Sequence, residues 1–218
     1  MSFSELFNLV FNEKRRNFLD KVARQQRRPR HELLLSDYRV AEAKIKIGDT
    51  LVAQLRETLD MFGLTRSKMQ QQFHEHFLSS CSQDLYKQDK DTDFVTVHAR
   101  QGWTNFKQST LCLTPRRMGK TTAVAMFVAA YLFCVPQTTI AIFSTGRRAS
   151  LKLLQQIRSM LLKLPDAELR VGNIKNKEDL VVQGNNKHDT RHVSSYPGNA
   201  KALRGVGGSL VILEEAAF

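Results

Sequence analysis

The segment from Leu113 to Thr122, Leu-Thr-Pro-Arg-Arg-Met-Gly-Lys-Thr-Thr, carries the strongest chemical signal in the sequence. A triphosphate requires several backbone N–H groups aimed at its oxygens, a lysine near its β- and γ-phosphates, and a hydroxyl for Mg²⁺. In this segment Gly119 allows the backbone to approach closely, Lys120 supplies the charge and Thr121 supplies the hydroxyl. The pattern therefore predicts a loop that binds ATP together with Mg²⁺.

This loop departs from the usual pattern G-x-x-x-x-G-K-[ST], because Thr114 stands at the position of the first glycine. A bare Gly-Lys-Thr also arises by chance. Here an apolar strand is expected over residues 110–114 and an apolar helix from Thr121, which is the context that a phosphate-binding loop needs. The predicted ATP-binding residues are Thr114, Pro115, Arg116, Arg117, Met118, Gly119, Lys120, Thr121 and Thr122.

A second motif lies near the end of the sequence, where residues 210–213 are apolar and are followed by Glu214 and Glu215. ATPases of the P-loop kind use one carboxylate at the end of a buried strand for Mg²⁺ and a neighbouring one to polarise the attacking water. Adjacent residues of a strand point to opposite faces. Both carboxylates can therefore serve only if the strand ends there, as Ala216-Ala217 suggests.

The elements that would position these residues alternate along the chain. Strands are predicted over residues 138–144 and 209–213, with a helix between them that has Leu154 and Ile157 on one face and ends before Pro165. Two short strands, 179–183 and 191–195, are expected to pair antiparallel through Gly184-Asn185-Asn186. The alternation predicts an α/β sheet of parallel strands with crossover helices.

The first ninety or so residues read differently, because their apolar residues recur at helical spacing, as in Leu51, Leu55 and Leu59. A basic stretch over residues 24–30 is either an exposed linker, a DNA contact or a nuclear-import signal. Residues 83–93 are polar and are interpreted as a linker. The predicted division is a helical region with its linker over residues 1–92 and an ATPase domain over residues 93–218.

The composition of the 218-residue chain, with a net charge of +12, favours a polyanionic partner, although a solvated basic surface would explain the charge equally well. Three scattered cysteines argue for a reducing compartment and against a disulfide framework or a zinc site. No secretory signal is apparent at the N-terminus. The longest apolar run, residues 123–135, is too short to span a bilayer, so no membrane partner is expected.

Taken together, these motifs resemble the large terminase subunits of herpesviruses and tailed phages, which use ATP to drive DNA into a procapsid. Their phosphate loop lacks the first glycine and has an arginine four residues before the lysine, as Arg116 stands before Lys120. The resemblance covers roughly residues 94–218. It extends through Ser144-Thr145-Gly146-Arg147-Arg148-Ala149, Ser194-Ser195, Leu203-Arg204-Gly205 and the segment 211–218.

The resemblance implies a P-loop NTPase fold with ATP and Mg²⁺ as cofactors, and it implies roles for individual residues. Arg116 would be the cis-acting arginine at the γ-phosphate, and Glu215 the catalytic carboxylate. Thr121 and Glu214 would hold Mg²⁺, and Arg204 would lie in the loop before the acidic strand, with a possible coupling role. Glu214 departs from the family, where aspartate is common at the Mg²⁺ position.

The resemblance further implies double-stranded DNA as substrate, a portal and a small terminase subunit as partners, and homo-oligomers of the full-length protein. The location would be the host nucleus for a herpesvirus-like source and otherwise the host cytoplasm. Because the family continues beyond this point into further strands and a nuclease domain, the resemblance implies a sheet that is incomplete at the C-terminus, and we expect the chain alone to be poorly active. Two alternatives remain: another nucleic-acid-dependent ATPase of the helicase kind, and a basic DNA-binding module with an inert loop.

Overall fold

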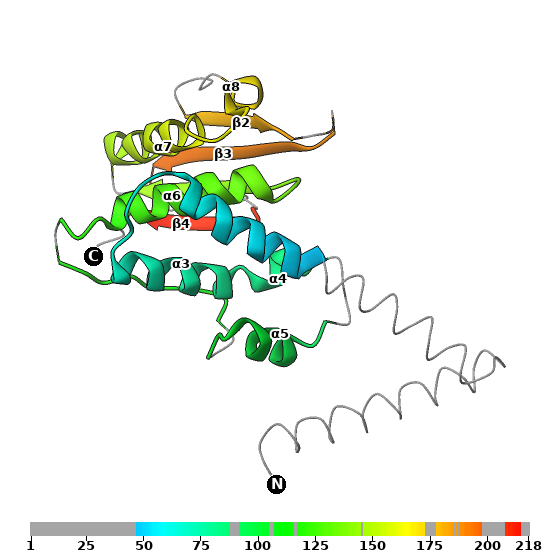
Figure 1. Cartoon of the computed structure of the whole chain (residues 1–218). Coiled ribbons are helices and arrows are strands. Elements are labelled where there is room, and N and C mark those ends of the chain that lie inside the picture. Colours follow the sequence, from blue (N-terminus) through cyan, green and yellow to red (C-terminus); the bar gives the residue numbers. More distant parts are fainter. Residues whose placement is uncertain are drawn as a thin grey trace, which may run out of the picture. The chain divides into compact units, whose positions relative to one another are not determined.

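The computed structural model describes residues 47–87, 92–104, 107–115, 117–144, 146–172, 178–184, 186, 188–197 and 208–214 (Figure 1). The basic stretch over residues 24–30 lies outside these residues. Within the described part of the chain, no helix combines the length and the hydropathy that crossing a membrane would require.

Four strands form one mostly parallel sheet in the order β2-β3-β1-β4 (Figure 1). β1 pairs in parallel with both β3 and β4, whereas β2 pairs antiparallel with β3. The prediction of an α/β sheet is confirmed at this level, and so is the antiparallel pair. The strands are β1 Thr139–Ser144, β2 Asp179–Gln183, β3 Thr190–Pro197 and β4 Leu210–Glu214.

Helices precede the sheet and connect its strands. A helix over residues 47–61 confirms the periodicity of Leu51, Leu55 and Leu59, of which Leu55 and Leu59 are buried. The other helices are α3 Lys68–Ser80, α4 Ser82–Leu85, α5 Phe94–Gln101, α6 Lys120–Cys134, α7 Arg147–Leu161 and α8 Ala167–Arg170.

Helix α6 occupies the centre of the core and is apolar around its whole circumference. A helix of this kind has to be covered on all sides, and α3 and α7 pack against it. Its buried residues join those of the sheet, including Ile140 and Ile142 of β1, in one continuous core. Helix α7 is amphipathic instead, burying Leu154, Ile157 and Leu161 while it lies over β1 and β3.

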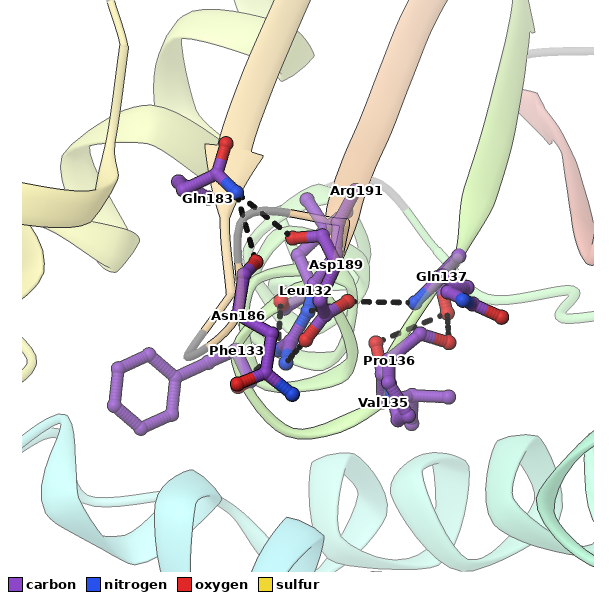
Figure 2. Close-up of polar contacts among 10 residues, drawn as sticks. Leu132, Phe133, Val135, Pro136, Gln137, Gln183, Asn186, Asp189 and Arg191 are labelled. Atoms are coloured by element: carbon purple, nitrogen blue, oxygen red, sulfur yellow. Dashed lines mark hydrogen bonds and ion pairs between the residues drawn. The ribbon is translucent and has the colours of Figure 1, made fainter.

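The C-terminal end of α6 is held by Arg191 of β3 (Figure 2). Its guanidinium donates hydrogen bonds to the carbonyl oxygens of Leu132, at 2.8 Å, and of Phe133. These are among the last carbonyls of the helix, which lack partners within the helix and carry its partial negative charge. Asp189 pairs with the same guanidinium at 2.6 Å and accepts from the backbone N–H of Gln137 at 2.8 Å. The pair thus ties β3 to the end of α6 opposite Lys120.

Two expectations about the local structure are wrong. Residues 110–114 do not form a strand, and Leu111 and Leu113 are 80% and 73% exposed. An apolar β-rich run becomes a strand only when a neighbour takes up its backbone hydrogen bonds, and no described strand pairs with it. The second error concerns the start of the linker expected over residues 83–93, because α4 (Ser82–Leu85) extends into it and buries Leu85. The domain division at residues 92 and 93 stays a prediction, although α3 and α6 pack together across it.

Candidate phosphate-binding site

The described part of the loop before α6 holds two residues in the left-handed backbone region. Arg117 and Gly119 both adopt positive φ angles, 66° and 75°, on either side of Met118. Left-handed residues turn successive N–H groups toward one side of the chain and create a concavity that suits anions. For the non-glycine Arg117 this conformation costs on the order of 1 kcal/mol, and such strain concentrates at binding sites.

Helix α6 begins at Lys120, directly after this turn. Gly119 caps the helix and offers no side chain to its free N–H groups, and no acidic residue stands in the first turn. The first N–H groups of a helix lack acceptors within the helix and carry its partial positive charge. The end of α6 therefore leaves room for an external anion at the point where the predicted loop meets it.

The Lys120 side chain folds back over its own loop. Its Nζ donates a hydrogen bond to the carbonyl oxygen of Thr114 at 2.9 Å, which closes the loop from its first position to its lysine. Thr114 stands where the usual pattern has its first glycine. The ammonium group is thus held inside the loop by one neutral acceptor, which a phosphate oxygen could replace.

Thr121 and Glu214 come together although they are far apart in the sequence. The Thr121 hydroxyl donates to Glu214 Oε1 at 2.6 Å. Thr121 lies in the first turn of α6 and Glu214 is the last residue of β4, so the contact joins the two motifs predicted from the sequence. A hydroxyl and a carboxylate are oxygen ligands of the type that Mg²⁺ takes, with waters and phosphate oxygens completing its shell.

A third oxygen lies beside this pair. Ser144 ends β1 and is the register partner of Glu214 in the parallel pairing of β1 with β4. Register partners project from the same face of a sheet, and neighbouring strands lie about 4.8 Å apart. Ser144 is 2% exposed, and its hydroxyl has no hydrogen-bond partner in the structure as described. An unsatisfied buried hydroxyl is costly unless a ligand or water pairs with it.

Two further side chains support the loop and were not anticipated from the sequence. Gln156 of α7 donates to the Thr122 hydroxyl at 3.2 Å. Gln70 of α3 donates to the carbonyl oxygen of Gly119 at 3.3 Å. Gln70 and Gln156 are polar residues on amphipathic helices, and their sequence context predicts that their side chains lie on the exposed faces of those helices. The one available signal was the pattern Ser67-x-x-Gln70, which marks the start of a helix.

The residues predicted for the site therefore divide into two groups. Those described from Thr114 to Thr122 lie in the loop and the first turn of α6, and Glu214 reaches them from β4. The remaining three, Arg116, Arg204 and Glu215, lie outside the described residues. The roles that the resemblance implies for these three stay predictions.

The chemistry of the described groups fits ATP with Mg²⁺. They offer a helix N-terminus without a side-chain cap, the Lys120 ammonium, the hydrogen-bonded oxygens of Thr121 and Glu214, and the Ser144 hydroxyl at the register position next to Glu214. No model of a protein family matches the sequence, and no curated protein matches it significantly. The function of the site has to be inferred from its own geometry.

Proposed function

We propose that the chain is the ATP-binding and ATP-hydrolysing part of a DNA-packaging motor of the viral terminase kind, with a P-loop NTPase fold. The observation that carries the proposal is the 2.6 Å hydrogen bond between Thr121 and Glu214. A Gly-Lys-Thr and an acidic strand end are each weak signals alone. Their meeting at the carboxyl end of a parallel strand, where α/β sheets bind ligands, supports a single site.

Each described group has a part in this proposal. The Lys120 ammonium leaves the Thr114 carbonyl, where it now lies at 2.9 Å, and binds the phosphate oxygens. The free N–H groups at the start of α6 bind the same oxygens along the helix axis. Thr121 and Glu214 would hold Mg²⁺, which neutralises the charge that develops on the phosphate oxygens during transfer.

The parts that the resemblance assigns to Arg116 and Glu215 complete the proposal. Arg116 would neutralise the γ-phosphate from within the chain, and Glu215 would orient the attacking water. The net charge of +12 supports double-stranded DNA as the partner, because neutralising phosphates releases condensed counterions. We therefore expect DNA binding to weaken steeply as the salt concentration rises.

The proposal is tested by measuring MgATP binding and ATP hydrolysis, with and without linear double-stranded DNA. The wild-type chain is compared with Lys120→Ala, Glu214→Gln and a control, Lys163→Ala, which removes an exposed lysine. A charge-assisted hydrogen bond contributes about 1.5–3 kcal/mol, so Lys120→Ala should weaken ATP binding roughly ten- to a hundredfold. Lys163→Ala should bind ATP as the wild type does.

Glu214→Gln should retain ATP binding in the absence of metal but lose the gain in affinity that Mg²⁺ provides. Equal ATP binding by the wild type and Lys120→Ala would refute a nucleotide site in this loop. Binding of DNA with no response to ATP would favour the alternative of a basic module with an inert loop.

A further inference from the structure

One side chain of α3 connects that helix to the phosphate loop. The carboxamide of Gln70 uses both of its ends: Oε1 accepts from the backbone N–H of Ser67 at 3.0 Å, and Nε2 donates to the carbonyl oxygen of Gly119 at 3.3 Å. The backbone N–H of Gln70 in turn donates to the Ser67 hydroxyl at 3.2 Å. The same residue therefore closes the capping box of α3 and contacts the loop glycine.

A second contact one turn along α3 holds the two helices in register. His74 bonds through Nε2 to the carbonyl oxygen of Ala123 at 3.0 Å, and Arg66 bonds to Nδ1 at 3.1 Å. Because a guanidinium only donates, Nδ1 is the acceptor and Nε2 carries the proton. Residues four apart share a helix face, so Gln70 and His74 line α3 along the first turns of α6. The rings of Phe77 and Phe127, whose centroids are 5.2 Å apart in an edge-to-face arrangement, continue this packing.

The position of Gly119 is restricted by this contact as well as by its own backbone. Its φ angle of 75° lies in the left-handed region, which glycine adopts without strain. A Cβ at this position would also lie 2.7 Å from Gln70 Nε2. A side chain at position 119 would therefore displace the carboxamide of Gln70 from its contact with the loop.

The contact also determines where a backbone donor of the loop points. The carbonyl of Gly119 and the N–H of Lys120 belong to one planar trans peptide and point in opposite directions. The carbonyl accepts from Gln70 and from the backbone N–H of Ala123, at 2.9 Å. With the carbonyl held on the side of α3 and the helix, the N–H of Lys120 is directed away from both.

We propose that Gln70 is a positioning residue of the nucleotide site, which holds the Gly119 peptide so that the N–H of Lys120 faces a phosphate oxygen. This inference rests on the proposed function, because it assumes that the loop binds ATP. Gln70 contacts no substrate itself. Its side chain joins the start of α3 to the loop through the single contact with Gly119.

Substitution with glutamate separates the two contacts of Gln70. Gln70→Glu keeps an oxygen that can accept from Ser67, since glutamate is a standard third residue of the capping box, but it has no donor for Gly119. Ser67→Ala is the matched control, because it removes the hydroxyl cap and leaves the contact with Gly119 in place. Gln70→Glu therefore changes only the end of the side chain that contacts Gly119, and Ser67→Ala changes only the cap on the backbone N–H of Gln70.

The experiment measures the thermal midpoint of each full-length variant without ligand and its dissociation constant for MgATP. The thermal midpoint of Gln70→Glu should lie within about 2 °C of that of the wild type. Its dissociation constant for MgATP should rise by about three- to tenfold, which corresponds to the loss of about one hydrogen bond. Ser67→Ala should show the converse, a lower midpoint with unchanged affinity. Hydrogen exchange at the backbone amide of Lys120, measured without ligand, should be faster in Gln70→Glu than in the wild type or in Ser67→Ala.

Wild-type affinity in Gln70→Glu, while Lys120→Ala loses binding, would overturn the inference about Gln70 and leave the proposed function intact. If Lys120→Ala binds MgATP with the same affinity as the wild type, the proposed function and the inference about Gln70 are both refuted. If Gln70→Glu does not fold, Gln70→Met, which matches the shape of glutamine but has no polar ends, replaces it. Wild-type affinity in that variant would equally overturn the inference.

Discussion

Thr121 donates a 2.6 Å hydrogen bond to Glu214 across 93 positions of sequence. The bond exists because β4 lies next to β1 in parallel, so that its last residue reaches the sheet edge from which α6 begins. The contact occupies two oxygens that a metal ion would take.

Thr121→Val should separate metal use from folding. Losing an oxygen that stabilises charge in the transition state costs several kcal/mol, so Mg²⁺-dependent turnover should fall on the order of a hundredfold. Thr121→Ser, which keeps the hydroxyl, should lose little. The measurement is ATP hydrolysis as a function of Mg²⁺ concentration, and equal loss in both variants would contradict the assignment of the hydroxyl.

Gly119→Ala should lower both stability and ATP affinity. Alanine with a φ angle of 75° is strained by about 1 kcal/mol, and its Cβ would lie 2.7 Å from Gln70 Nε2. Gly102→Ala is the control, because Gly102 has a similar φ of 73° with open space around a Cβ. Thermal unfolding should detect a loss in both variants, whereas MgATP binding should be weakened only by Gly119→Ala. Normal binding in Gly119→Ala would argue against the cradle.

His74 should make stability depend on pH. Burial, opposed by the hydrogen bond to Ala123 and aided by Arg66, lowers the pKa of His74 from 6.5 to about 4, while Glu75 and Asp60 raise it slightly. The unfolded chain therefore binds more protons between these values. The free energy of unfolding is at its full value above pH 6.5 and should fall, by up to about 3 kcal/mol, as the pH drops toward 4.

Denaturant unfolding at several pH values tests this dependence. His74→Gln keeps a donor for the Ala123 carbonyl but has no titrating group, so its free energy of unfolding should vary less over the same interval. If the free energy of unfolding of His74→Gln depends on pH as that of the wild type does, groups other than His74 cause the dependence.

Arg191→Met should be strongly destabilising. It removes two hydrogen bonds from the end of α6 and leaves the carboxylate of Asp189, whose side chain is 13% exposed, without its charge partner. Breaking a buried pair from one side costs about 3–5 kcal/mol. Arg147→Met is the control, because its ion pair with Glu178 is exposed and should contribute at most about 1 kcal/mol. Comparable losses in the two variants would contradict the structural role of Arg191.

Ser144→Ala should have opposite effects on stability and activity. Its buried hydroxyl has no described partner, so removing it without ligand should be neutral or stabilise by up to about 1 kcal/mol. If the hydroxyl binds water beside Thr121 and Glu214, hydrolysis of MgATP should slow. Thermal unfolding and turnover measured on the same preparation decide this, and a destabilised variant with normal turnover would make Ser144 purely structural.

Most secondary structure could be predicted from the sequence. The apolar helix after Lys120 and the strands before and after α7 follow from local periodicity, because burial on one face or on all faces repeats with the geometry of the element. The prediction of a strand over residues 110–114 was wrong, because local periodicity does not show whether a run of residues finds a strand to pair with. Its residues are suited to a strand, but pairing depends on a neighbour that composition does not reveal.

The sequence alone determined the chemical types of the site, since a turn with glycine, lysine and threonine before an apolar helix is a local arrangement. Only the tertiary structure decided which distant side chains meet it. The contact of Glu214 with Thr121 and the place of Ser144 depend on the register of parallel strands, and that of Gln70 depends on how α3 packs on α6. Such contacts join residues far apart in the chain, so a local pattern does not predict them, and the pairing of Thr121 with Glu214 was expected only from the family resemblance.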